Sequence, residues 1–283
     1  MRRRISMLIV VLVFVLVGGL GLSALSKVRG VAAQANCQNN LRQLGMAVGG
    51  SYDCFNSYPP AVVPNDKLAC NQRLSWLVDI VPFAEQMYLG IDRSKAWDAD
   101  ENRVPTTRHY SGLHDEKGTI GPLGEMRFFR CPANPVTAPP DAPGLTDYVG
   151  VSGIGSDAAE RSLGYPGVGF FGCNRKLKRE DITDGTGNTF MVLETNKDNG
   201  PWTAGGFPTV RGLDPAGGSY LGKDGQFGSG HRSCNGWFSL KSTTLTHAVF
   251  ADGSVRSLSE AIDSRTLEAW ATIAGGEETG TLE

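Results

Sequence analysis

The first sixty residues change from an uninterrupted apolar run to an alternation of apolar and polar positions. Residues Met7 to Leu25 carry no charged side chain and follow three arginines, Arg2 to Arg4. A helix over this run rises roughly 28 Å, close to the thickness of the hydrocarbon core of a membrane. The sequence therefore predicts a transmembrane helix whose N-terminus lies in the cytoplasm.

A cleaved secretory signal is the alternative interpretation of this segment, because Ala24-Leu25-Ser26 offers small residues at a cleavage position. Both interpretations export everything that follows Lys27 and differ only on anchoring. The predicted partner of Met7 to Leu25 is the lipid bilayer. The predicted location is the cell membrane, crossed once, with the remainder of the chain in the periplasm or outside the cell.

The helix is expected to continue beyond Lys27, because the first proline is Pro59. Apolar residues recur at helical spacing, and polar residues fall largely on the other side. The apolar positions are Val31, Cys37, Leu41, Leu44 and Val48, and the polar ones are Gln34, Gln38, Asn39, Arg42 and Gln43. The pattern predicts an amphipathic helix that ends near Gly49-Gly50 or Tyr52.

After Ser57 the apolar positions come in short runs between glycines and prolines, which favours strands and turns over a helical bundle. Strands are predicted at Phe128-Phe129, Phe190 to Leu193 and Ala248 to Ala251. Asp252-Gly253 separates Leu245–Ala251 from Ser254–Leu258 and predicts a hairpin with a type I′ turn. Leu267, Trp270 and Ile273 predict a short helix closed by Gly275-Gly276.

Together these elements predict an α+β fold in which one long N-terminal helix packs on a mainly antiparallel, β-rich head with long loops. The expected parts are 1–27, the cytoplasmic tip and transmembrane helix, and 28–58, the amphipathic continuation. The head is expected over 59–276 and a flexible acidic tail over 277–283.

Composition excludes some partners and leaves the cysteines open. The net charge is -2, and no run of like charges gives the basic footprint of a nucleic-acid-binding protein. The six cysteines form no Cys-x-x-Cys pair, so zinc is not expected from their spacing. They are Cys37, Cys54, Cys70, Cys131, Cys173 and Cys234. Up to three disulfides and a set of buried thiols are equally compatible with this spacing.

Gly167, Gly169 and Gly172 match the spacing of a dinucleotide-binding loop, but Tyr165-Pro166 precedes them in place of a strand. A turn is therefore predicted there. The familiar motifs of hydrolases, zinc proteases and nucleotide-binding loops do not occur in the sequence. His109 and His114 are expected in a solvated polar loop.

Oxygen-bearing side chains gather on one tight turn, at Asp181, Asp184 and Asn188. Such side chains can bind Ca²⁺, although the spacing is not that of an EF-hand, and Asx turns are the alternative interpretation. No other cofactor or metal is expected. His231 follows Gly228-Ser-Gly230 and could orient a turn by hydrogen bonds or help to form a site, of which the structural role is favoured.

The chain resembles a large planctomycete family of pilin-like proteins of unknown function, also labelled as solute-binding. Ordered motifs carry the resemblance: Cys37 to Gly45, Tyr58 to Pro60, Arg73 to Val78, Phe129 to Pro132, Asp147 to Gly150, Ile182 to Thr189 with Glu194, and Phe250 to Val255. The family signature of a histidine before Asp-Gly corresponds to His231, Asp252 and Gly253, with an insertion between them.

One departure concerns the N-terminus. The family resemblance implies a prepilin-type start, with a glycine ahead of the apolar run and an early glutamate. Here the first glycine is Gly18 and the first glutamate is Glu85. A fixed single-pass anchor is therefore expected in place of a processed pilin.

Three functions are compatible with these features. The first is a pilin-like or pseudopilin-like structural protein that associates with other such subunits or with a secretion assembly. The second is a tethered binding module for a solute, glycan or protein, with a pocket lined by Trp76, Trp97, Trp202 or Trp237. The third is an exported enzyme, which requires convergent titratable groups that the spacing does not show. The sequence favours the first, and no catalytic residue is expected.

Overall fold

The computed structural model describes residues 2–84, 87–102, 106–109, 126–134, 136–137, 144–234 and 242–276. Residues 2–24, 87–89, 106–109, 234 and 242 are described by their backbone alone. Where side chains are described, no helix combines the length and apolar character needed to cross a membrane. Residues 7–24 of the predicted membrane span lie outside that part, as does the predicted tail, 277–283.

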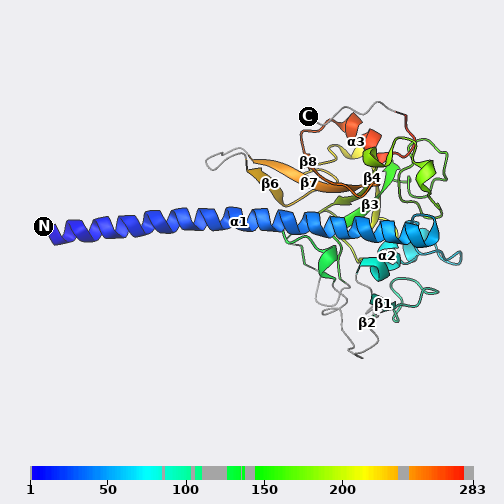
Figure 1. Ribbon diagram of the computed structural model, residues 1–283, viewed down its shortest axis with the longest axis horizontal. Coiled ribbons are helices and arrows are strands. Elements are labelled where there is room, and N and C mark those ends of the chain that lie inside the picture. The colour runs from blue at the N-terminus through cyan, green and yellow to red at the C-terminus, as the bar shows by residue number, and fades with distance from the viewer. Residues whose placement is uncertain are drawn as a thin grey trace.

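A single helix, α1 (Arg2–Phe55), runs through the N-terminal 54 described residues and projects far beyond the head (Figure 1). Its end is set by Asn56, which has a φ of 51° and donates its backbone N–H to the Tyr52 carbonyl over 2.7 Å. Tyr58-Pro59-Pro60 follows and belongs to no helix or strand. The predicted continuous helix is confirmed, and it ends three residues beyond Tyr52.

The buried face of α1 begins at Cys37. Cys37, Leu41, Leu44 and Val48 are buried against the head as predicted, whereas Val31 is 66% exposed. The prediction for Val31 was wrong because this residue lines an open groove between α1 and β6 and is not packed into the core. A Cβ on Gly45 would lie 3.0 Å from Cγ2 of Val249, so this glycine lets the helix approach the sheet closely.

The head is built on a six-stranded sheet with the order β5-β3-β4-β7-β6, in which β8 also pairs with β7. Its strands are β3 (Tyr148–Ile154), β4 (Phe190–Glu194), β5 (Val210–Leu213), β6 (His231–Cys234), β7 (Ser242–Phe250) and β8 (Val255–Ser259). Only the β3–β5 pair is parallel. The predicted α+β class and mainly antiparallel sheet are thus confirmed.

Helices cover both faces of this sheet (Figure 1). One core contains Leu41 and Leu44 of α1 together with residues of α2 (Trp76–Ala84). The other core contains Leu267 and Trp270 of α3 (Ser264–Ala271). The predicted C-terminal helix is confirmed, although Ile273 lies just beyond it. A separate two-stranded sheet pairs β1 (Met87–Gly90) with β2 (Thr106–His109).

The predicted hairpin is present between β7 and β8, but its turn is of another type. Gly253 has a φ of 84°, while Asp252 does not have a positive φ. Phe250 donates to the Ser254 carbonyl and accepts from the N–H of Gly253, both over 2.9 Å. These bonds define a three-residue loop with glycine in the left-handed position, so the type I′ prediction was wrong.

Two further predictions were wrong. Phe128-Phe129 belongs to a 3-10 helix (Arg127–Phe129), which turns both rings into the core, and does not form a strand. His109 was expected in a loop and lies on β2, while His114 lies outside the described residues. The helix α2 was not predicted, because the glycines and prolines after Ser57 favoured strands and turns over helices.

Candidate functional site

Two disulfides join distant parts of the chain. Cys37 of α1 pairs with Cys131, and Cys70 pairs with Cys173. Cys54 is exposed and unpaired, and the side chain of Cys234 lies outside the described part. For four cysteines the choice between disulfides and buried thiols is therefore settled. The Cys37–Cys131 bond fixes the long helix to the head at the point where α1 enters it.

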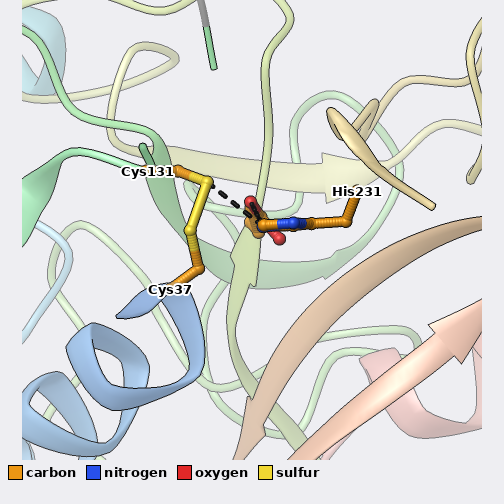
Figure 2. Close-up of side chains that lie close together, drawn as sticks. Cys37, Cys131 and His231 are labelled. Atoms are coloured by element: carbon orange, nitrogen blue, oxygen red, sulfur yellow. Dashed lines mark hydrogen bonds and ion pairs between the residues drawn. A yellow bond between two sulfur atoms is a disulfide. The ribbon is translucent and has the colours of Figure 1, made fainter. Parts of the chain in front are cut away.

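Polar side chains surround this disulfide inside the protein. Nε2 of His231 lies 3.2 Å from Sγ of Cys131 and 3.1 Å from Oε1 of Glu194 (Figure 2). All four residues are buried. They come from α1, the segment after the 3-10 helix, β4 and β6, so the fold brings together positions spread over almost 200 residues. We call Cys37, Cys131, Glu194 and His231 the junction cluster.

Asp147 contacts the junction cluster through the backbone of Cys131. Its carboxylate accepts hydrogen bonds from the Cys131 N–H (2.6 Å) and from the Asn134 and Asn199 side-chain amides (2.6 and 2.7 Å). Arg130 approaches the same carboxylate at 3.2 Å. Burial raises the pKa of Asp147 to about 6, although Arg130 and the hydrogen bonds act in the opposite direction. Asp147 thereby holds the backbone of Cys131 in place.

His247 lies beside His231, with ring centroids 4.7 Å apart. Its Nδ1 forms a 3.0 Å hydrogen bond with Oγ of Ser257, and its backbone N–H donates to Oε2 of Glu194 over 3.2 Å. Nε2 is buried and has no hydrogen-bond partner among the described residues. Burial lowers the pKa of His247 to about 4, so the ring is neutral at physiological pH.

The lowered pKa of His247 predicts a loss of stability in acid. The unfolded chain binds a proton near pH 6.5 and the folded chain near pH 4, so stability falls as pH drops through this window. The full effect is about 3 kcal/mol. Replacing His247 with glutamine, which does not titrate, removes this dependence of stability on pH. The difference in the free energy of unfolding between the variant and the parent should therefore shift by about 3 kcal/mol in favour of the variant when the pH is lowered from 7.5 to 4. Denaturant unfolding measures this difference.

The comparison with His247→Gln is needed because Asp147 changes the stability of the parent in the opposite direction when the pH is lowered. Its raised pKa makes the folded chain bind a proton first, so its contribution to stability falls as pH rises from 3.8 to about 6. This contribution is common to both proteins and cancels in the difference. A difference that stays constant from pH 7.5 to pH 4 would contradict a neutral buried His247.

The predicted family-signature residues are not brought together. His231 pairs with Leu245 near the start of β7, whereas Asp252 and Gly253 lie in the turn beyond its other end. The Asp252 carboxylate accepts the N–H of Ser254 over 2.8 Å, and its backbone N–H donates to the Thr186 carbonyl over 3.0 Å. Asp252 and Gly253 therefore shape a turn, and His231 alone belongs to the junction cluster.

The three calcium candidates are engaged in hydrogen bonds with backbone groups, and those of Asp184 reach the segment after α3. The Asp184 carboxylate accepts hydrogen bonds from the N–H groups of Gly275 (2.6 Å) and Gly276 (3.0 Å). Asp181 accepts from the N–H of Lys178 over 2.8 Å, and the Asn188 amide donates to the Asp184 carbonyl over 3.2 Å. Across the described side chains, the junction cluster is the only group of three or more His, Cys, Asp or Glu with metal-ligand spacing.

The glycine-rich segment and the tryptophans behave as structural residues. The turn predicted around Gly167 is confirmed, and among the described residues between Gly172 and α3 there is no α-helix. Trp76 and Trp202 are fully buried in the core. The indole N–H of Trp97 donates to the Asn71 carbonyl over 3.0 Å, and Trp237 lies outside the described residues.

Sequence reasoning missed the roles of Asp147, Glu194 and His247. Each is a polar residue within or directly beside a run of buried strand positions. Glu194, for example, ends the otherwise apolar strand β4. An ionisable residue at such a position must find a partner, since an unpaired buried charge is costly. That signal was available, but the identity of each partner depends on strand order.

The fold and the junction cluster define an α+β protein in which a disulfide fastens a projecting helix to a β-rich head. The chain belongs to the family described as "Protein of unknown function (DUF1559)", labelled SBP_bac_10, whose model matches residues 26–265. No curated protein and no solved structure matches the chain. The resemblance is thereby confirmed as far as a family of unknown function.

Proposed function

We propose that the chain is a membrane-anchored, outward-facing, pilin-like structural or assembly protein. The observation that carries this proposal is the continuity of α1, which leads from the apolar segment into the core of the head without a break. Residues 25–36 of α1, which we call the stalk, expose Leu25, Val28 and Val31 by 55 to 66%. A rigid stalk of this kind would hold the head at a fixed distance from a bilayer.

The covalent structure of the head supports export. Two disulfides join positions 94 and 103 residues apart in the sequence. Disulfides persist in the periplasm and outside the cell, and they are rare in the reducing cytoplasm. The three arginines ahead of the apolar run would stay inside, which sends the head outward.

Fractionation of the full chain tests the anchor. The parent protein is expected in the membrane fraction with an intact N-terminus by mass spectrometry. Val13→Arg combined with Leu16→Arg should remove it from that fraction, because each arginine costs about 3 kcal/mol at the centre of a membrane helix. Val28→Arg, in the stalk, is the matched control and should remain in the membrane. A soluble parent protein that starts near Lys27 would contradict the anchor.

A tethered binding module is the second candidate. A groove of about 970 Å³ lies between the stalk and the edge of β6, lined mainly by apolar surface that includes Val28, Val31 and Leu245. The label of the matching family model also refers to solute binding. Chemical crosslinking in membranes separates the two candidates, because assembly through α1 yields a ladder of multimers and a singly tethered module yields monomers.

A further inference from the structure

We propose that the junction cluster is a redox-gated site for a thiophilic divalent metal ion such as Zn²⁺. Each of its four residues contributes one ligand atom, and all four atoms lie within 4.8 Å of one another. With the disulfide closed, the sulfurs are bonded to each other and the site is shut. With the disulfide reduced, two thiolates, one imidazole and one carboxylate surround a single point. This inference does not depend on membrane anchoring.

The donor set suits zinc in number and kind. Structural zinc sites are tetrahedral, with cysteine sulfur at about 2.3 Å and histidine nitrogen or carboxylate oxygen at about 2.0 to 2.2 Å from the metal. These bond lengths place neighbouring ligand atoms about 3.3 to 3.8 Å apart. Nε2 of His231 already lies 3.2 Å from Sγ of Cys131 and 3.1 Å from Oε1 of Glu194. Separation of the two sulfurs by side-chain rotation is the main adjustment required.

Neighbouring groups hold the ligands in place. The second carboxylate oxygen of Glu194 accepts the backbone N–H of His247 over 3.2 Å, which leaves Oε1 directed at His231. Asp147 binds the backbone N–H of Cys131, and Oγ of Ser229 accepts the N–H of His231 over 3.1 Å. Such contacts orient ligands before the metal arrives and are characteristic of functional metal sites.

The groove beside the stalk provides access to the cluster. His231 lines this groove together with its neighbours Gly230 and Arg232 and with Ala133, two residues after Cys131. The Cys70–Cys173 bond has no such surroundings, because no histidine or carboxylate within the described residues joins it in a metal-binding group. The chain thus contains its own matched control for a disulfide without metal ligands.

The electrons that open the Cys37–Cys131 bond come from an external reductant, and no other group of the protein changes its oxidation state. A dithiol reductant supplies two electrons and two protons to the Cys37–Cys131 bond and becomes a disulfide. The two thiols formed then release their protons as the metal binds, because the thiolate is the ligand. Reoxidation by a disulfide of the same class expels the ion. The site therefore exchanges a covalent link between α1 and the head for a coordinate one.

Cobalt(II) substitution tests the proposal on the full chain in detergent, in a Cys54→Ser/Cys234→Ser background. After reduction with a phosphine, one equivalent of Co²⁺ should give the d–d and thiolate charge-transfer absorption of a tetrahedral site, and Zn²⁺ should displace it. The oxidised protein should give no such bands. Zinc should also raise the Tm of the reduced protein, since a ligand that binds only the folded chain stabilises it.

Variants assign the bands to these residues. Cys37→Ser with Cys131→Ser should abolish them, whereas Cys70→Ser with Cys173→Ser should keep them. His231→Gln and Glu194→Gln keep all four disulfide cysteines, so they are expected to fold in the oxidised form and to weaken cobalt binding by about tenfold or more after reduction. Bands that persist without Cys37 and Cys131, or affinity unchanged by both glutamine variants, would overturn the proposal. A reduced parent chain that binds no cobalt, whether folded or unfolded by circular dichroism, would also overturn it.

Discussion

Replacing Cys37 and Cys131 together by serine is expected to lower the free energy of unfolding by about 4 to 5 kcal/mol. The bond spans a sequence separation of 94 residues, so its loss frees a long loop in the unfolded chain. It also removes the covalent tie at the point where α1 enters the head. Denaturant unfolding of the full chain in detergent, followed by circular dichroism, measures the change.

Two other cysteine variants show whether loop closure explains this cost. Cys70→Ser with Cys173→Ser opens a loop of similar size, with a separation of 103 residues, and should cost nearly as much. Cys54→Ser alters an exposed thiol and should change stability by less than about 0.5 kcal/mol. If the Cys37 and Cys131 pair costs no more than Cys54→Ser, the crosslink does not stabilise the head.

Local patterns predicted the elements that depend on neighbours in sequence. The apolar run, the helical spacing of Cys37 to Val48 and the absence of proline before Pro59 together predicted the continuous helix α1. Asp252-Gly253 between apolar runs was sufficient for the β7–β8 hairpin. Its turn type was not predictable, because the Asp252 N–H is held by the Thr186 carbonyl of another segment.

Helical periodicity did not predict which residues of the apolar face of α1 are buried, because the sequence does not show where the head contacts the helix. Val31 fits the apolar stripe of α1 as well as Leu41 does, yet only Leu41 is buried against the head. The helical pattern records which residues share a face, and it does not record where the head begins. Phe128-Phe129 shows the same limit, since two adjacent buried rings are compatible with a strand or with one turn of 3-10 helix.

The candidate site was the least predictable part. Cys37, Cys131 and Glu194 were each visible within motifs of the sequence, and His231 matched the family signature, with a structural role favoured for it. No spacing rule joins them, because they are separated by 94, 63 and 37 residues. Their meeting requires the order β4-β7-β6 in the sheet and the packing of α1 across it. Long-range topology of this kind is not encoded in local patterns.

Replacing Asp147 with alanine is expected to destabilise the head by about 3 to 5 kcal/mol at pH 7.5, since it removes the carboxylate that pairs with Arg130 and that accepts hydrogen bonds from buried donors. The Asp147 side chain is fully buried and Arg130 is only 15% exposed, so water cannot replace the lost carboxylate. The Cys131 N–H and the Asn134 side-chain amide lose this acceptor, whereas the Asn199 amide keeps its hydrogen bonds to the Thr146 and Thr195 carbonyls. Denaturant unfolding gives the value.

A surface aspartate provides the matched control for Asp147. Asp157 pairs with Arg161 at 2.6 Å, but its side chain is 64% exposed, so Asp157→Ala should cost less than about 1 kcal/mol. Asp147→Asn should fall between the two alanine variants, because it keeps the volume and one acceptor but presents an N–H to groups that are themselves donors. Equal costs for Asp147→Ala and Asp157→Ala would show that the network behind Cys131 does not hold the junction cluster together. In that case the ligand geometry proposed for the metal would lack its support.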